Sequence, residues 1–242
     1  MKDKNEIRIL GLTLARGGSK TVFKKNIRPI CGKPLISYTI KEAQKSKFLS
    51  RYIVSTDDQE IKKVAESFGA EVPFVRPSEY SSDSASSVSA MQHAVRWVEN
   101  QEGVKYDYVV ELMCTNPMKN VYDIDMAIEK LIKTNSDSVI AVHQLEDHHP
   151  ARNKKIVDDK IVDFCVSEIP ESRRQDLTPK AYIRSGSIYA LRRDFLMNEG
   201  KRYGSSNSRP YILPEERAVN IDTELDFLMA EILINKIKEN EN

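Results

Sequence analysis

The stretch Leu14-Ala15-Arg16-Gly17-Gly18-Ser19-Lys20 follows an apolar run at residues 7–14, and Lys24-Lys25-Asn26 comes shortly after it. The apolar run predicts a buried strand, and the glycines after it let backbone N–H groups approach an anion closely. Arg16 can bind phosphate oxygens with both arms of its guanidinium group, and the lysines add positive charge. The stretch therefore predicts a phosphate-binding loop, with an ordinary basic turn between a strand and a helix as the alternative.

This loop matches neither of the common nucleotide-binding motifs. A Walker loop places lysine before the serine or threonine, whereas here Ser19 precedes Lys20, and the dinucleotide pattern G-x-G-x-x-G is absent. A dehydrogenase built on that dinucleotide pattern is therefore disfavoured.

Strand-like runs alternate with helix-like patterns through most of the chain. We expect a strand at 52–55 and then a helix that Asp57 or Asp58 caps and that ends at Gly69. A helix over 84–100 would be capped by Ser82 or Asp83. The other expected strands are 72–75, 108–113, 138–142 and 186–191, and the other expected helices are 35–46, 121–134 and 224–238.

This alternation predicts the α/β class, with three layers and a mostly parallel sheet. Ligands of such sheets bind beyond the carboxyl ends of the strands. Arg16, Asp57, Arg76 and Thr115 each follow a strand-like run, so we expect them to share one crevice.

The alternation breaks between about residues 145 and 184. Residues 156–162 read Ile-Val-Asp-Asp-Lys-Ile-Val, which predicts a hairpin with a polar turn. A lone hairpin is too small to be stable by itself. We therefore expect a single domain over residues 1–242, with an insertion at about 146–184.

The composition excludes several classes of protein. A net charge of +1 over 242 residues gives no reason to expect nucleic acid or a membrane surface as a partner, and no run approaches the length of a membrane span. Cys31, Cys114 and Cys165 lack metal-site spacing and are expected to be buried thiols in a reducing compartment. We find no signal-peptide pattern and expect a cytoplasmic protein.

A set of short motifs runs in order from residue 7 to about residue 235. The motifs are Ala15-Arg16-Gly17-Gly18-Ser19-Lys20-Thr21, Lys25-Asn26, Gly32-Lys33-Pro34-Leu35, Val54-Ser55-Thr56-Asp57, Arg76-Pro77, Ser82-Asp83-Ser84-Ala85-Ser86-Ser87, Arg174-Gln175 and Ile221-Asp222-Thr223-Glu224-Leu225-Asp226. In this set and order the chain resembles the acylneuraminate cytidylyltransferases, or CMP-sialic acid synthetases. The resemblance implies a Rossmann-like nucleotidyltransferase fold whose insertion forms a homodimer and reaches the partner's active site.

The resemblance also assigns nucleotide-binding residues one by one. It places Arg16, Ser19, Lys25 and Asn26 against the triphosphate and ribose of CTP. Ala15 and Lys20 belong to the same loop, and Arg76 and Ser87 match positions that contact the nucleotide. Arg16, Lys25 and Asp222 are expected to be catalytic. For residues 82–87, a polar loop with a helix cap remains the alternative.

Asp222 matches a metal-ligand position, which implies Mg²⁺ or Mn²⁺ as a cofactor. Mg²⁺ takes one or two carboxylates together with substrate phosphates. The family usually has a second aspartate where this chain has Asn220, which offers only a neutral carbonyl oxygen. We expect Asp222 and Asn220 to form the metal site, and the departure puts its affinity or geometry in question.

Four residues are expected to bind the sugar: Met113, Arg152, Arg174 and Tyr189. Met113 replaces a family glutamine that contacts the sugar, and it cannot hydrogen bond as an amide can. The preferred sugar should therefore differ from N-acetylneuraminate near that contact. Arg152 and Arg174 could face the sugar carboxylate, for which a guanidinium group is suited. Packing in the core is the alternative for Tyr189.

The reaction that the resemblance implies transfers CMP from CTP to the anomeric hydroxyl of a nine-carbon 2-keto acid sugar of sialic, legionaminic or pseudaminic type, with release of pyrophosphate. One alternative is a cytidylyltransferase for another acidic sugar, such as an eight-carbon one. The other is a catalytically weak nucleotide-binding regulatory homologue, for which Met113 and Asn220 are the motive.

Overall fold

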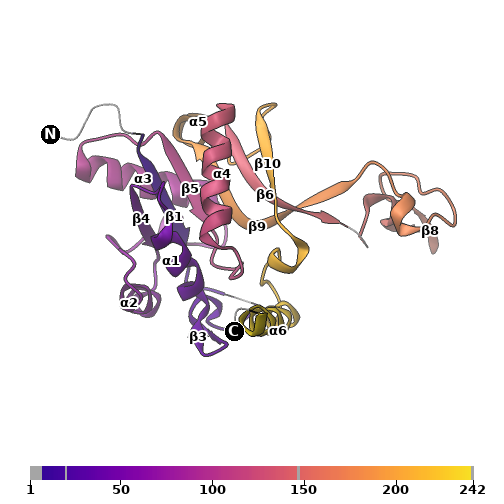
Figure 1. The fold of residues 1–242 in the computed structure, drawn as a ribbon, viewed down its shortest axis with the longest axis horizontal. Coiled ribbons are helices and arrows are strands. Elements are labelled where there is room, and N and C mark those ends of the chain that lie inside the picture. The colour runs from indigo at the N-terminus through magenta and orange to yellow at the C-terminus, as the bar shows by residue number, and fades with distance from the viewer. Residues whose placement is uncertain (1–6, 20, 146–147, 241–242) are drawn as a thin grey trace.

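The computed structural model describes residues 7–19, 21–145 and 148–240, and a six-stranded sheet of order β10-β6-β9-β5-β1-β4 lies at its centre (Figure 1). Strand β9 runs antiparallel to both of its neighbours, and the other pairs are parallel, which confirms a mostly parallel sheet. The strands are β1 (Ile9–Leu14), β4 (Arg51–Ser55), β5 (Tyr108–Leu112), β6 (Ser138–Leu145), β9 (Ala181–Arg192) and β10 (Ser208–Ile212).

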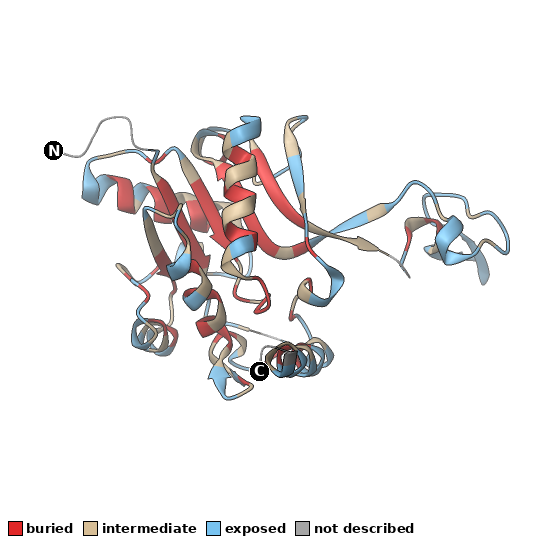
Figure 2. Ribbon diagram, viewed as in Figure 1, coloured by how far each residue is buried: buried red, intermediate tan, exposed pale blue. Residues whose placement is uncertain are grey.

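Helices cover both faces of the sheet, which confirms the three-layer α/β fold. Helices α1 (Leu35–Lys45) and α4 (Val121–Thr134) pack on one face, and α3 (Ser87–Glu102) and α5 (Arg193–Glu199) pack on the other (Figure 1). Figure 2 shows that the buried residues gather in the central strands and on the helix faces that meet them. Alternate side chains of β5 point to opposite faces, so Glu111 lies on the α3 face with Val109.

The remaining helices lie at the edges of the sheet. Helix α2 (Gln59–Ser67) packs against β4 and α1, and α6 (Glu224–Asn240) packs on the segment that follows the phosphate loop. No helix in the described part of the chain has the length and apolar character needed to cross a membrane. The shorter elements are β2 (Pro29–Ile30), β3 (Lys33–Pro34) and the 3₁₀ turns Lys25–Ile27, Ser78–Tyr80, Pro150–Arg152, Arg174–Asp176 and Glu215–Arg217.

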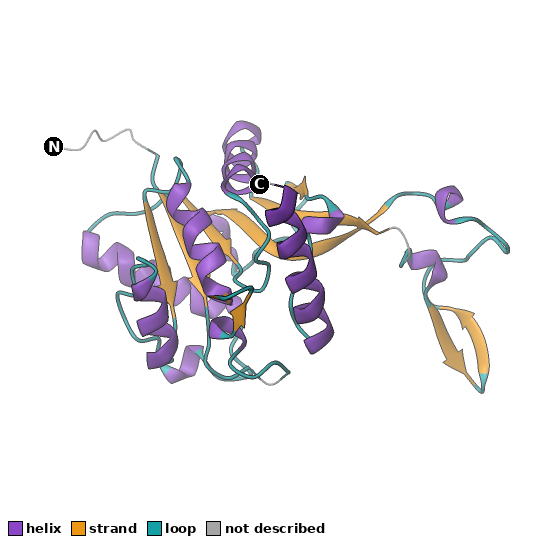
Figure 3. Cartoon of the chain, turned by 60° about the horizontal axis from the view of Figure 1, so that its bottom comes forward, coloured by secondary structure: helices purple, strands orange, loops and turns teal. Residues whose placement is uncertain are grey.

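Strands β6 and β9 continue as a paired ribbon to Leu145 and Ala181, and the segment between them stands apart from the body (Figures 1 and 3). We call its described residues, 148–180, the arm. It contains the hairpin of β7 (Lys154–Val157) and β8 (Lys160–Asp163), as expected. Every residue of these two strands is exposed, so the hairpin has no core of its own.

Local signals set most element ends. The Asp58 carboxylate accepts from the backbone N–H groups of Glu60 and Ile61 at the start of α2, as expected. Helix α4 has the expected bounds and begins with a capping box. The expectation for α3 is wrong in detail, because it begins at Ser87 and its cap is Ser86, whose Oγ accepts from the Ser89 N–H.

Other expectations are also wrong. Residues 72–75 form no strand: Val75 makes only a single bridge to Thr56, because Pro73 has no N–H to donate. Helix α5 and strand β10 were not anticipated. Of the three cysteines, only Cys114 is buried, while Cys165 is exposed on the arm, where there is too little core to cover it.

Candidate active site

The loop after β1 lies where β1 and β4 end. Ala15 is buried, and its N–H donates to the Ser55 carbonyl at 3.0 Å. The Gly17 N–H donates to Asp57 Oδ1 at 3.2 Å. A Cβ on Gly17 would lie 2.6 Å from Asp58 Oδ2 and 2.9 Å from Asp58 Cβ, so this position requires glycine.

The same loop turns back at Ser19, and the side chain of Asn26 holds its backbone in place. The Ser19 N–H donates to the Gly17 carbonyl at 3.0 Å, and Lys20 lies outside the described residues. Asn26 is buried; its Nδ2 donates to the Arg16 carbonyl at 2.9 Å, and its Oδ1 accepts from Cys114 Sγ at 3.1 Å. Burial raises the pKa of the Cys114 thiol, which keeps it a protonated donor and not a nucleophile.

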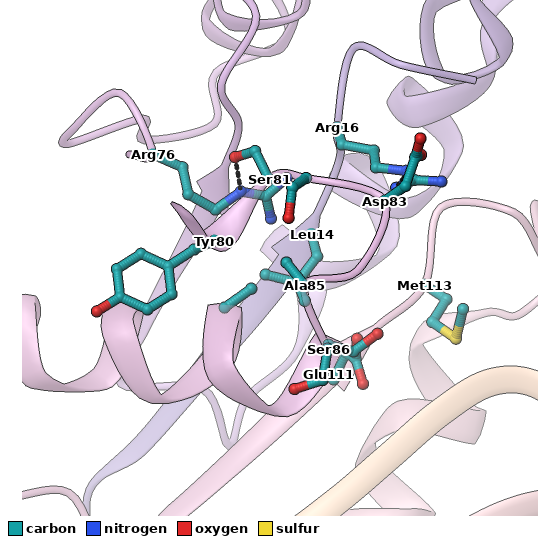
Figure 4. Close-up of a pocket in the computed structure, with 13 residues that line it drawn as sticks. Leu14, Arg16, Arg76, Tyr80, Ser81, Asp83, Ala85, Ser86, Glu111 and Met113 are labelled. Atoms are coloured by element: carbon teal, nitrogen blue, oxygen red, sulfur yellow. Dashed lines mark hydrogen bonds and ion pairs between the residues drawn. The ribbon is translucent and has the colours of Figure 1, made fainter. Parts of the chain in front are cut away.

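A cavity of about 350 Å³ opens between this loop and the N-terminus of α3 (Figure 4). Arg16, Arg76, Ser87 and Met113 line it, so the structure brings these four residues together. Arg16 is exposed at the cavity, and its Nη1 lies 3.2 Å from Asp83 Oδ1. Two guanidinium groups and the positive end of a 16-residue helix therefore surround the space, which suits an anionic ligand.

Arg76 is held in place by its own neighbours. It is 4% exposed, its Nε donates to Ser81 Oγ at 3.0 Å, and its Nη2 lies 3.5 Å from Asp57 Oδ1. Burial lowers the pKa of Arg76, and the Asp57 carboxylate opposes that shift. Asp57 does not line the cavity itself but contacts Arg76, which does. Thr115 does not line the cavity either, and its carbonyl accepts from the Ile221 N–H.

A second polar cluster joins residues 21–25 to the segment before α6. Lys25 Nζ donates to the Ile221 carbonyl at 2.8 Å and lies 3.1 Å from Asp222 Oδ1. Asn220 Nδ2 donates to Asp222 Oδ2 at 2.5 Å. Lys25 therefore positions Asp222, and both carboxylate oxygens have a donor.

These residues fit a hard divalent cation. The Asp222 side chain is 66% exposed, and Asn220 Oδ1 is buried without a hydrogen-bond partner among the described groups. Rotating the amide by half a turn would turn that oxygen toward the Asp222 carboxylate, so that both residues could offer an oxygen to a cation, with phosphates and water completing its ligands. No group of three or more His, Cys, Asp or Glu in the described ranges could hold a metal by itself.

Asp226 has a different role. Its carboxylate accepts from the backbone N–H groups of Asp222 and Thr223, and Thr223 Oγ1 accepts from the Asp226 N–H at 3.2 Å. This reciprocal pattern caps α6, so Asp226 is not free to act as a ligand.

The four residues expected at the sugar divide into two groups. Met113 lines the cavity directly after β5, and Tyr189 lies 4% exposed on β9, in the core beside it. Arg152 and Arg174 lie on the arm, where Arg152 Nε is 3.7 Å from Glu168 Oε1 and Arg174 lines a separate hollow with His149. Within one chain, the structure does not bring the two arginines to the cavity.

Sequence reasoning missed an ion pair at the cavity. Glu111 is 2% exposed and lines the cavity, and Arg202 Nη1 donates to its Oε2 at 2.6 Å. The sequence did contain a sign that Glu111 is functional, because it is the one charged residue in the apolar run 108–113 and charged residues are rarely buried without a partner. Arg202 lies in an irregular stretch that carries no such signal.

The buried Lys119 was also missed. Its Nζ donates to Thr39 Oγ1 at 2.8 Å and to the carbonyls of Met113 and Asn116 at 2.6 and 2.5 Å. It thereby fixes the backbone that carries Met113. Burial lowers the pKa of Lys119 to about 7.

Comparison with known proteins identifies the family of the chain. A family model described as cytidylyltransferase matches residues 10–230. The chain is 35% identical over 226 residues to a pseudaminic acid cytidylyltransferase of Campylobacter jejuni, covering 90% of this chain and 93% of the relative. It is 33% identical over 232 residues to a CMP-N,N'-diacetyllegionaminic acid synthase of Campylobacter jejuni, covering 94% and 95%.

A solved structure supports the fold. A CMP:2-keto-3-deoxy-manno-octonic acid synthetase in complex with CTP superposes with a TM-score of 0.69 at 20% identity, over 95% of this chain and 99% of that one. The matched length and the relatives above 30% identity settle the assignment: the chain belongs to the cytidylyltransferase family.

Proposed function

We propose that the protein transfers CMP from CTP to the anomeric hydroxyl of a nine-carbon 2-keto acid sugar of sialic, legionaminic or pseudaminic type. The names of the pseudaminic and legionaminic relatives support this class of substrate. The structural observation that carries the proposal is the cavity where Arg16 and Arg76 meet the N-terminus of α3 beyond the end of β1.

In the proposed reaction the anomeric oxygen attacks the α-phosphorus of CTP in line. A new phosphorus–oxygen bond forms, the bond to the bridging oxygen toward the β-phosphorus breaks, pyrophosphate leaves with that electron pair, and the hydroxyl proton passes to solvent. Arg16 would stabilise the phosphate charge, and Ser19, Lys25 and Asn26 would hold the loop and nucleotide in place. Catalysis of this kind depends mainly on positioning and charge stabilisation.

Mg²⁺ or Mn²⁺ is the proposed cofactor, held by Asp222 and Asn220 together with the phosphates. Such an ion neutralises charge on the phosphates when it is bound. Cys31, Cys114 and Cys165 are free thiols, which supports a location in a reducing compartment, and we propose the cytoplasm.

A homodimer through the arm is also proposed. Ile156 and Ile161, which pair across the hairpin, and Ile169 are 78%, 76% and 77% exposed. Apolar side chains exposed together on the arm support an interaction surface there. An arm that crosses to a second copy would bring Arg174, which its own cavity does not use, to the partner's sugar site. Light scattering at the assay concentration tests this, and a fully active monomer would rule it out.

Pyrophosphate release with CTP and a panel of acidic sugars tests the function. The panel contains N-acetylneuraminate, legionaminic- and pseudaminic-type acids, and an eight-carbon 2-keto acid. Turnover of nine-carbon acids supports the proposal, turnover of the eight-carbon acid alone supports the other substrate, and no turnover supports the regulatory homologue.

Met113 cannot hydrogen bond as an amide does. We therefore expect Met113→Gln to shift preference toward N-acetylneuraminate and away from the other nine-carbon acids. If the ratio of their kcat/KM values is the same in wild type and Met113→Gln, Met113 does not contact the sugar.

A further inference from the structure

Glu111 and Met113 form one wall of the cavity. They are two positions apart along the direction of β5, so both side chains lie on the α3 face, with Cα atoms about 6.6 Å apart at the usual rise of a strand. In Figure 4 the Glu111 carboxylate and the Met113 thioether both lie below Arg16. A charged acceptor and an apolar side chain are therefore neighbours on the same surface.

The carboxylate of Glu111 has hydrogen-bonding capacity to spare. A carboxylate can accept about four hydrogen bonds, and among the described residues Arg202 is its one donor, at 2.6 Å. Arg202 is fixed in turn, because its guanidinium carbon lies 4.6 Å from the centre of the Tyr189 ring. Tyr189 is the cross-strand neighbour of Glu111 on β9, so the arginine meets the carboxylate beside that ring, and Glu111 also lines the cavity.

Stability alone does not explain this pair. The cost of desolvating two charges commonly cancels their attraction, so buried ion pairs add little net stability. Burial raises the pKa of Glu111, and the Arg202 guanidinium opposes that shift. The 2.6 Å hydrogen bond from Arg202 shows that the carboxyl group serves as an acceptor. An acceptor on a cavity wall selects ligands that present a donor.

We propose that Glu111 and Met113 together select an acylamino substituent on the acidic sugar, with the N–H donating to Glu111 and the acyl methyl packing on Met113. An acylamino group carries a donor and an apolar methyl side by side, which matches the two side chains. A hydroxyl satisfies only the acceptor, and a methyl satisfies only the methionine. Arg202 is a positioning residue that orients the carboxylate. This inference rests on the proposed function.

The test compares sugars that differ in one substituent. Two pairs of nine-carbon 2-keto acids are used, with acetamido exchanged for hydroxyl at carbon 5 in one pair and at carbon 7 in the other. In wild type, one pair should show a preference for the acetamido sugar in kcat/KM. Glu111→Gln should lower that preference about 10-fold or more, because Arg202 occupies the one amide oxygen and the NH2 group then faces the N–H of the sugar, which loses its acceptor, while the KM for CTP stays near wild type.

A matched control separates recognition from stability. Glu99 is 9% exposed and pairs with Arg193 through two hydrogen bonds of 2.9 and 2.8 Å, but it does not line the cavity. Glu99→Gln should lower the melting temperature by a similar amount and leave both sugar ratios unchanged. If Glu111→Gln does not fold, Glu111→Met combined with Arg202→Met removes both charges and should show the same loss of preference.

Two outcomes would overturn the inference while the proposed function stands. In the first, wild type turns over nine-carbon acids, but a folded Glu111 variant shows the same two sugar ratios as wild type. The other is a raised KM for CTP with unchanged sugar ratios, which would place the carboxylate at the nucleotide. Wild type that releases no pyrophosphate with any nine-carbon acid would instead contradict the proposed function, and the inference with it.

Discussion

Replacing Gly17 with alanine tests whether the loop after β1 is held by close contact with the start of α2. The new Cβ would lie 2.6 Å from Asp58 Oδ2, which could swing away, but also 2.9 Å from Asp58 Cβ, which cannot. Moving Asp58 breaks its bonds to the N–H groups of Glu60 and Ile61, at 2.7 and 3.0 Å. Loss of such a cap costs about 1 kcal/mol, and loss of the Gly17–Asp57 hydrogen bond costs about 1 kcal/mol more.

Gly18→Ala is the matched control, because a Cβ at Gly18 would meet no atom within 4 Å. Alanine there should be neutral or should stabilise by about 0.5 kcal/mol through the unfolded chain. The two variants should therefore differ by about 2 kcal/mol in the free energy of unfolding, or about 4–8 °C in melting temperature for a chain of this size.

Urea unfolding gives the free energy, and pyrophosphate release gives kcat/KM for CTP, which should fall in Gly17→Ala because the loop carries Arg16. Equal stability of the two variants would refute the packing argument.

The remaining predictions concern the phosphate contact, the metal and a buried lysine. Arg16→Ala should lower kcat/KM by the equivalent of about 2–4 kcal/mol, and a folded variant with wild-type kinetics would remove Arg16 from the site. Asp222→Asn should raise the concentration of Mg²⁺ or Mn²⁺ needed for activity, and Asn220→Asp should lower it; metal titrations unchanged in both would place the ion elsewhere. The pKa of Lys119 is lowered to about 7 in the folded protein, whereas in the unfolded chain the lysine keeps its proton up to a pH of about 10.4. Between pH 7 and about 10 the unfolded state therefore binds more protons than the folded state. The free energy of unfolding of wild type, relative to that of Lys119→Met, should rise with pH in this range by at most about 1.4 kcal/mol per pH unit. Unfolding curves at several pH values measure this difference, and a flat difference would contradict the burial of a charged lysine.

The regular part of the fold could be predicted because its signals are local. Residues 121–134 show a helical apolar pattern, and the residue before them is an asparagine that caps α4, so the bounds agree with the structure. Strand β10 could not be predicted in this way, because Pro210 and Arg209 make the segment look irregular, and it is an edge strand held by its pairing with β6. Its position depends on contacts that the sequence pattern does not contain.

In the candidate site, too, some residues could be predicted from local sequence and others could not. The loop residues Arg16 and Gly17 follow a strand, and their position could be predicted from that alone. The pairing of Glu111 with Arg202 joins residues 91 positions apart and depends on how the segment after α5 folds back over the sheet. No short pattern in the sequence contains such a contact.

The most direct test of the account uses CTP, a nine-carbon 2-keto acid labelled with ¹⁸O at the anomeric hydroxyl, and ³¹P NMR of the products. The account predicts a CMP-sugar whose phosphorus signal carries the isotope shift, together with unlabelled pyrophosphate in equal amount. An unshifted CMP-sugar, label in the pyrophosphate, or CTP consumed without a CMP-sugar would contradict transfer of CMP to the anomeric oxygen.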